Sequence, residues 1–173
     1  MEMRGRNFVN GLGFPNPPGV SGARGYSHTA VASGPGQTVY IAGQFGMKDG
    51  TFAGAPGDFR AQVTQCFENV KQALAAAGAT FNDVARITNY FVDMANLPVF
   101  FEVRDKYVNV KAPPASTAIQ VVKLARDEAL FEMEAIAFLP EKARAAGAKR
   151  GGSLKERVAK RTAAKKSSAT RRR

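Results

Sequence analysis

Two glutamates stand out among the residues that could do chemistry, because they interrupt an otherwise apolar stretch. Glu132 and Glu134 alternate with Phe131, Met133 and Ala135 near the end of residues 113–137, PPASTAIQVVKLARDEALFEMEAIA. At a period of two, both carboxylates lie on one side of a β-strand and the apolar side chains on the other. Either both face water on an open sheet, or one is held in a pocket, where it could act as a general acid or base.

Other residues that often carry catalysis are few. Cys66 falls among apolar residues at helical spacing, which predicts a small core residue rather than a nucleophile. It is the only cysteine, which excludes an internal disulfide, and with a single histidine the chain lacks a cluster of metal ligands. No Ser, Cys or Asp lies at a spacing from His28 that would indicate a catalytic pair, so we interpret His28 as a structural or surface residue. Cysteine usage favours a reducing, cytoplasmic compartment.

The positive charge is confined to one end of the chain. Residues 1–140 contain 12 Lys or Arg and 12 Asp or Glu, whereas residues 141–173 contain 13 Lys or Arg and only two acids. The net charge of +11 therefore belongs to the last segment. We expect an irregular Gly- and Pro-rich arm over residues 1–25, a neutral domain over 26–140 and a basic tail over 141–173. No apolar run is long enough for a membrane span, and no signal peptide precedes the domain.

Alternating apolar residues predict five strands that would position the glutamates. Strands are expected over residues 26–33, 38–42, 85–92, 115–124 and 131–138. Gly34 and Pro35 predict a hairpin between the first two strands, and a polar turn predicts a second hairpin between the last two.

Two amphipathic helices complete the predicted domain. Asp58 suits the N-cap of a helix whose apolar face runs from Phe59 to Ala77, and Gly78 suits its end. A second helix is expected over residues 98–108, with proline in its first turn. This order predicts an α+β fold, a mixed sheet covered on one face by two helices. The uncovered face would carry Val, Ile and Met, which favours association with other copies of the chain.

Several motifs, taken in order, resemble the RidA (YjgF-type) reactive-intermediate deaminase family. They cover residues 26–139, and each is weak alone, whereas their order and spacing are specific. The matching pieces are Tyr26, the segment VYIAGQ at 39–44, Gln62, Asn69-Val70, Leu74, Ala77-Gly78, Val84, NYFVD at 89–93, Pro114-Ala115 and FEMEAIA at 131–137.

The resemblance implies a chorismate-mutase-like fold, a homotrimer, and ligand clefts between neighbouring subunits. Enzymes of the family hydrolyse enamines or imines to 2-keto acids and ammonia without a metal or organic cofactor. Carried over residue by residue, the family's acidic residue corresponds to Glu132 and its tyrosine to Tyr26. The glycine of its SGQ-like turn corresponds to Gly43, and the backbone after its Pro-Ala-Arg-Ser-like motif to Thr117 and Ala118.

Two positions depart from the family pattern. Ser116 stands where the family has an arginine that pairs with the substrate's carboxylate, and Phe101 replaces a frequent asparagine. A guanidinium forms a two-pronged, charged contact with a carboxylate, whereas a serine hydroxyl forms one neutral bond. The change should weaken carboxylate binding about 10- to 100-fold. A neutral or bulkier ligand therefore suits this pocket better, unless Arg24 or Lys123 compensates.

Two classes of function remain open on the sequence. The first is a small hydrolase that uses Glu132 to activate water. The second is a non-catalytic trimer that binds a metabolite or RNA, since members of the family have also been described as ribonucleases. The basic tail is expected to be disordered or a frayed helix, to bind nucleic acid nonspecifically, or to bind an anionic membrane surface. The last is disfavoured because no apolar face accompanies the charge.

Overall fold

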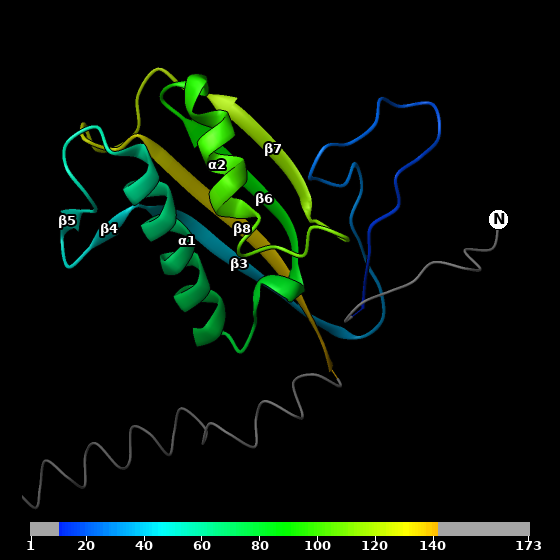
Figure 1. The fold of residues 1–173 in the computed structure, drawn as a ribbon. Coiled ribbons are helices and arrows are strands. Elements are labelled where there is room, and N and C mark those ends of the chain that lie inside the picture. Colours follow the sequence, from blue (N-terminus) through cyan, green and yellow to red (C-terminus); the bar gives the residue numbers. More distant parts are fainter. Residues whose placement is uncertain (1–10, 142–173) are drawn as a thin grey trace, which may run out of the picture. The chain divides into compact units, whose positions relative to one another are not determined.

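The computed structural model describes residues 11–141, which form a four-stranded mixed sheet with two helices on one face (Figure 1). The strand order is β3-β8-β6-β7. These strands are β3 (Gly36–Phe45), β6 (Val84–Phe91), β7 (Ala115–Gln120) and β8 (Phe131–Pro140). Only β6 and β7 run parallel to each other; the other two pairs are antiparallel. Residues 1–10 of the predicted arm and residues 142–173 of the predicted basic tail lie outside the described residues.

The predicted C-terminal hairpin is wrong, because β6 lies between β7 and β8. β8 pairs with β3 on one side and with β6 on the other, which makes it a central strand. Its inner residues Phe131, Met133, Ala135 and Ala137 are all buried. β7 is exposed from Ala118 to Gln120 and lies at the edge. The more apolar segment thus takes the inner position, and the loop over residues 121–130 carries the chain across.

The predicted N-terminal hairpin is also wrong. Residues 26–33 supply only the two-residue strand β2 (Val31–Ala32), which pairs with β1 (Leu12–Gly13) rather than with β3. Ser27 instead bridges to Ala115 at the start of β7. The arm predicted to be irregular therefore contributes a short strand, and Leu12 is fully buried, as its apolar character predicts. A further small hairpin joins β4 (Met47–Lys48) to β5 (Thr51–Phe52).

The helices form as their caps and apolar faces predict. Helix α1 (Phe59–Ala76) begins where the Asp58 carboxylate accepts a hydrogen bond from the Ala61 amide, and Gly78 follows its end at φ +82°. Helix α2 (Leu97–Arg104) is shorter than predicted, because the chain tightens into turns after Arg104. Short 3₁₀ turns precede β6 and α2, at η1 (Phe81–Asp83) and η2 (Met94–Asn96).

Both helices pack on the same face of the sheet, around stacked and edge-on phenylalanines (Figure 1). Phe59 of α1 and Phe100 of α2 contact Phe91 of β6 and Phe131 of β8, at ring-centroid distances of 5.0–5.9 Å among these pairs. Cys66 is fully buried in this core, which confirms its predicted place. Burial raises the pKa of its thiol, which therefore stays protonated.

The opposite face of the sheet has no helix over it among the described residues. Its exposed apolar side chains are Tyr40, at 76% exposure, and Ile119, at 41%. Met133 lies in the core with Phe131 and Ala135, on the side of the strand opposite the glutamates, as the alternation predicts. Association of chains through this face stays a prediction. Within the described range, no helix is long and apolar enough to cross a membrane.

Candidate functional site

Glu132 lies on the uncovered face of the sheet, beside a bulge in β3. The pairing of β3 with β8 shifts between Ile41 and Gln44, so that Ala42 and Gly43 form the irregular step. A Cβ atom added at Gly43 would lie 1.8 Å from Glu132 Oε1. Gly43 therefore leaves the space that the carboxylate occupies, and these two predicted residues come together.

Burial and a neighbouring carboxylate favour the protonated form of Glu132. Partial burial, and then the nearby negative charge of Glu134, raise the pKa of the Glu132 carboxyl above 4.5. Among the described residues, none donates a hydrogen bond to the Glu132 carboxylate, whereas Glu134 accepts one from the Tyr90 hydroxyl at 3.3 Å. Glu132 thus has its lone pairs available for a water or a ligand, and Glu134 is held by Tyr90.

Three side chains of α1 hold the backbone that carries this pair. The Gln62 amide donates to the Glu128 carbonyl and accepts from the Leu130 amide, which fixes the loop before β8. Asn69 donates to the carbonyls of Phe45 and Met47, just after the bulge. The Cys66 thiol donates to the Gln44 carbonyl at 3.1 Å. The helix therefore positions both strands that meet at Glu132.

Ser116 belongs to a second group of residues, at the start of the edge strand β7. Asn89, which is fully buried, donates from Nδ2 to Ser116 Oγ at 3.1 Å and to the Thr117 carbonyl at 2.9 Å. The Ser116 hydroxyl keeps its proton free to donate elsewhere. Ala118 lies opposite Asn89 in the pairing, and the side chain of Thr117 points to the other face.

Tyr26, Phe101 and Arg104 lie at the same end of β7. Tyr26 precedes Ser27, whose amide donates to the Pro114 carbonyl and whose hydroxyl donates to the Pro113 carbonyl. The Arg104 guanidinium lies over the ring of Phe101, 4.7 Å from its centroid. The same guanidinium approaches Gly25 so closely that an added Cβ would lie 2.2 Å from its nitrogen. His28 contacts the Tyr26 ring edge-on and bonds the Ser21 carbonyl.

Glu132 and Ser116 point to opposite faces of the sheet. Glu132 pairs with Tyr90, whose partner in β7 is Ile119, three residues beyond Ser116. Two strand spacings and three residues of rise separate the two backbones by roughly 14 Å. Ser116 shares the side of Asn89, which the helices cover. One copy of the chain therefore does not bring all the predicted site residues to one place.

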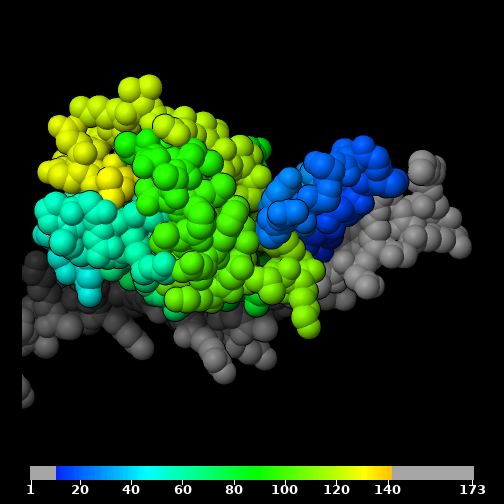
Figure 2. All heavy atoms as spheres, turned by 45° about the horizontal axis from the view of Figure 1, so that its top comes forward, coloured from blue at the N-terminus to red at the C-terminus, as the bar shows by residue number. Residues whose placement is uncertain are grey.

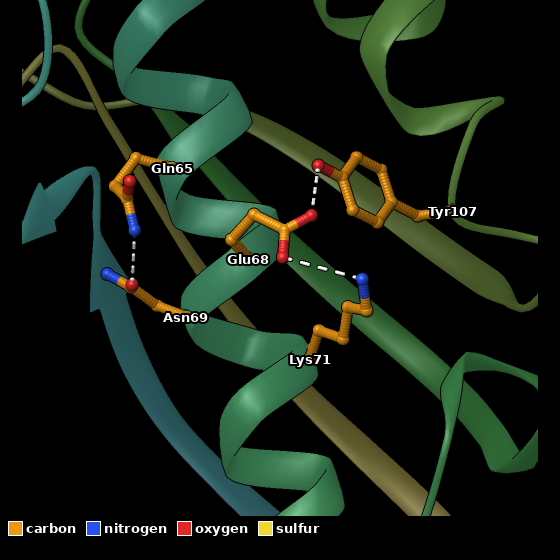
Figure 3. Close-up of polar contacts among 5 residues, drawn as sticks. All are labelled: Gln65, Glu68, Asn69, Lys71 and Tyr107. Atoms are coloured by element: carbon orange, nitrogen blue, oxygen red, sulfur yellow. Dashed lines mark hydrogen bonds and ion pairs between the residues drawn. The ribbon is translucent and has the colours of Figure 1, made fainter.

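A separate hollow of about 580 Å³ lies on the outer side of α1, lined in part by Glu68, Lys71, Phe81, Lys106 and Tyr107. The Tyr107 hydroxyl donates to Glu68 at 2.8 Å, and Lys71 pairs with the same carboxylate (Figure 3). Burial and the Glu68 carboxylate raise the pKa of Tyr107 to about 12, so the phenol keeps its proton. None of the predicted site residues lines this hollow, and its polar contacts join α1 to the segment after α2.

Sequence reasoning missed several residues that support the site. Gln62 and Asn69 were recognised only as parts of a motif, and their hydrogen bonds to the backbone could not be read from the sequence. Asn89 lay within a strand motif and gave no separate signal, and its Oδ1 is buried without a partner among the described residues. Arg104 was overlooked because a basic residue in the last helical turn usually faces water. The described residues hold no group of three His, Cys, Asp or Glu side chains that could bind a metal.

Comparison with known proteins gives one consistent result. The family model described as Endoribonuclease L-PSP matches residues 19–139. A RutC family protein of Pyrococcus abyssi is 36% identical over 103 residues, which cover 60% of this chain and 80% of that protein. A 2-iminobutanoate/2-iminopropanoate deaminase of Mus musculus is 34% identical over 101 residues, covering 58% and 73%.

Solved structures of the same family share the fold. The structure of the Rid family protein YyfB of Yersinia pestis is 32% identical, with a TM-score of 0.65, and covers 75% of this chain and 99% of its own. RidA from an Antarctic Psychrobacter is 29% identical with a TM-score of 0.55, and covers 79% and 100%. The mixed sheet with two helices thus agrees with the predicted YjgF-type, chorismate-mutase-like α+β fold.

Proposed function

The chain belongs to the RidA (YjgF) family, whose family model is described as Endoribonuclease L-PSP, and from that premise we propose that it hydrolyses imines or enamines to carbonyl compounds and ammonia. The observation that carries the proposal is the position of Glu132. Its carboxylate lies beside Gly43 with no described donor bound to it, and its pKa is raised. Perturbed carboxyl groups of this kind are suited to general acid–base work.

In the proposed reaction, Glu132 takes a proton from water as the water oxygen bonds to the carbon of the C=N group. The nitrogen gains protons and leaves as ammonia when the C–N bond breaks, and a carbonyl group remains. A raised pKa helps Glu132 to return the proton to the leaving nitrogen. The bulge at Gly43 keeps backbone groups close to the reacting atoms, where they can stabilise developing charge.

The proposed cleft lies between copies of the chain. Glu132 and Gly43 lie on the uncovered sheet face, whereas Ser116 and Phe101 belong to the helix-covered side at the β7 edge. A second copy that packs against the uncovered face would bring its own β7 end to Glu132. The exposed Tyr40 and Ile119 are the kind of apolar side chains that such an interface buries. We propose a homotrimer, which closes such a heterologous contact into a ring.

The contacts that β7 itself offers are proposed to differ from those of relatives that have an arginine in place of Ser116. Asn89 holds the Ser116 oxygen, so Ser116 offers one neutral O–H donor to a ligand. Tyr26 and Phe101 add ring surface at the same end of β7. Ser116 alone therefore selects a ligand by shape and one hydrogen bond rather than by charge.

The test is ammonia release from freshly generated imines, with and without a 2-carboxylate. Glu132→Gln should lower the rate about 10²- to 10⁴-fold, the range for loss of a general acid–base group. Glu134→Gln is the matched control, since it changes a neighbouring carboxylate that Tyr90 already holds. A Glu132→Gln chain as active as the parent, or no rate above background in the parent, contradicts the proposal.

A second candidate is nonspecific RNA binding through residues 141–173. The observation that favours it is the concentration of 13 Lys or Arg in that segment. Such binding should weaken steeply with salt, because phosphate contacts release counterions. If RNA binding survives deletion of residues 141–173, the tail has no part in it.

A further inference from the structure

Arg104 is a buried cation close to the residues of the β7 end. Its side chain is 5% exposed, and its ion-pair partner among the described residues is Asp105, whose side chain is 47% exposed. Nε and one terminal nitrogen of the guanidinium both donate to the same oxygen, Asp105 Oδ1, at 2.9 and 2.6 Å. Burying a guanidinium is costly unless it is paired, so its charge must be matched in every state of the site.

Two contacts of this guanidinium, and one backbone bridge of the segment it touches, connect it to the predicted ligand-binding residues. It stacks on Phe101, it lies against Gly25 next to Tyr26, and Ser27 joins that segment to the start of β7 just before Ser116. Figure 2 shows the N-terminal segment (blue) against the surface formed by α2 and the chain that follows it (green). Gly25 has φ +73°, a conformation that favours glycine and lets the backbone approach the guanidinium.

We propose that Arg104 is the anion-binding residue of this site, and that Asp105 occupies its binding position until an anionic ligand replaces it. The proposal rests on the proposed function, because it assigns Arg104 to the same cleft. Ser116 alone predicts a neutral ligand. With Arg104 the site has a guanidinium after all, and the last turn of α2 supplies it instead of β7. The preferred ligand then carries a carboxylate or a comparable planar anion.

The exchange conserves charge. Asp105 is half in solvent, so its carboxylate can turn into water without losing hydration. A ligand carboxylate can then accept the hydrogen bonds from Nε and the terminal nitrogen of Arg104 that Asp105 Oδ1 accepts in this structure. A planar guanidinium suits a two-pronged contact with such a ligand.

Titration of the full chain with 2-oxobutanoate, and with its methyl ester as the neutral match, tests the proposal by calorimetry. Arg104→Met should weaken 2-oxobutanoate binding about 10-fold or more and leave the ester almost unchanged. Arg104→Lys should recover only part of the loss, because an ammonium lacks the planar fork. Asp105→Asn should strengthen 2-oxobutanoate binding about 3- to 10-fold, because the competing carboxylate is gone.

Arg60→Met is the control, since it removes an exposed arginine that pairs with Glu102 elsewhere on the helices. Asp105→Asn keeps the test decisive if Arg104→Met does not fold. Failure of the parent to bind 2-oxobutanoate, or equal binding by Arg104→Met or Asp105→Asn and the parent, overturns the assignment. Arg104-dependent binding without ammonia release supports Arg104 and rejects the proposed hydrolase. If Arg104→Met hydrolyses iminocarboxylates with an unchanged KM, the proposed hydrolase is supported and the role of Arg104 is rejected.

Discussion

The two halves of the proposed site differ in what holds them. Around Glu132, main-chain geometry decides the arrangement: the β3 bulge, the space left by Gly43, and the backbone bonds of Gln62 and Asn69. At the start of β7, side chains decide it: Ser116 held by Asn89, and Arg104 stacked on Phe101.

This difference agrees with the prediction that the β7 half, rather than the Glu132 half, departs from the family pattern. A site that main-chain geometry holds in place tolerates few substitutions, because a change at Gly43 or Gln62 displaces both β3 and β8. A side-chain site can exchange one donor for another without moving the strand. We therefore expect the Glu132 half to accept few substitutions among relatives, and the β7 half to vary with the ligand.

The largest expected effect is at the backbone half. Gly43→Val places carbon atoms where Glu132 Oε1 lies, so the carboxylate must move. Displacement by about 1 Å should lower the rate of ammonia release about 100-fold. Ala42→Val, at an exposed residue of the same bulge, is the control and should keep most of the activity.

Ser116→Arg sharpens the comparison from the other half. In an Arg104→Met chain, a guanidinium on β7 should raise kcat/KM for 2-carboxylate imines about 10- to 100-fold, since it restores a charged two-pronged contact. Ser116→Met is the control: methionine is a long side chain like arginine but carries no charge, so it should not raise kcat/KM. If Ser116→Arg gives none either, the β7 half no longer binds this class of substrate.

Gln62→Leu tests the support under Glu132. The change removes the buried Gln62 amide that bonds the Glu128 carbonyl and the Leu130 amide, and should lower the free energy of unfolding by about 2 kcal/mol. Gln72→Leu, on the exposed side of α1, is the matched control. Denaturant titration measures the stability of both variants. Equal stabilities would show that the hydrogen bonds of Gln62 do not stabilise the fold.

The smallest expected effect is a shift in pH dependence. The Glu132 pKa is raised in the folded chain, so the ionised base appears only above pH 4.5, and the acid limb of the rate profile lies there. The same group contributes most stability below pH 4.5, and that contribution is lost as pH rises through the raised pKa. Glu134→Gln removes one cause but not burial, so the acid limb should move down only part of the way. If the acid limb of the pH–rate profile does not move in Glu134→Gln, the charge of Glu134 does not contribute to the raised pKa of Glu132.

Local sequence patterns predicted where helices and strands form better than they predicted which strands pair. The alternation over residues 131–138 placed both glutamates on one side of a strand, and Asp58 and Gly78 marked the ends of α1. Both predicted hairpins failed, because alternation does not reveal which strand lies beside which, and the pairing of β8 with β3 joins segments about 100 residues apart.

The site was predictable only where a motif carried it. Glu132 and Gly43 came from the family pattern and lie together. The sequence predicted a serine at position 116 in place of the family's arginine. It did not reveal Arg104, because the burial of Arg104 depends on how Gly25 and Phe101 fold around it. A contact between segments distant in sequence leaves no local signature.

The central claim is that Glu132 and the β7 end act together only across two copies of the chain. Equal amounts of Glu132→Gln and Ser116→Phe chains, unfolded and refolded together, test it by ammonia release. If each site takes Glu132 from one copy and β7 from another, about a quarter of the sites in a random mixture are intact, so about a quarter of the parental rate should return. Activity no higher than that of the two inactive parents refolded separately would contradict the shared site.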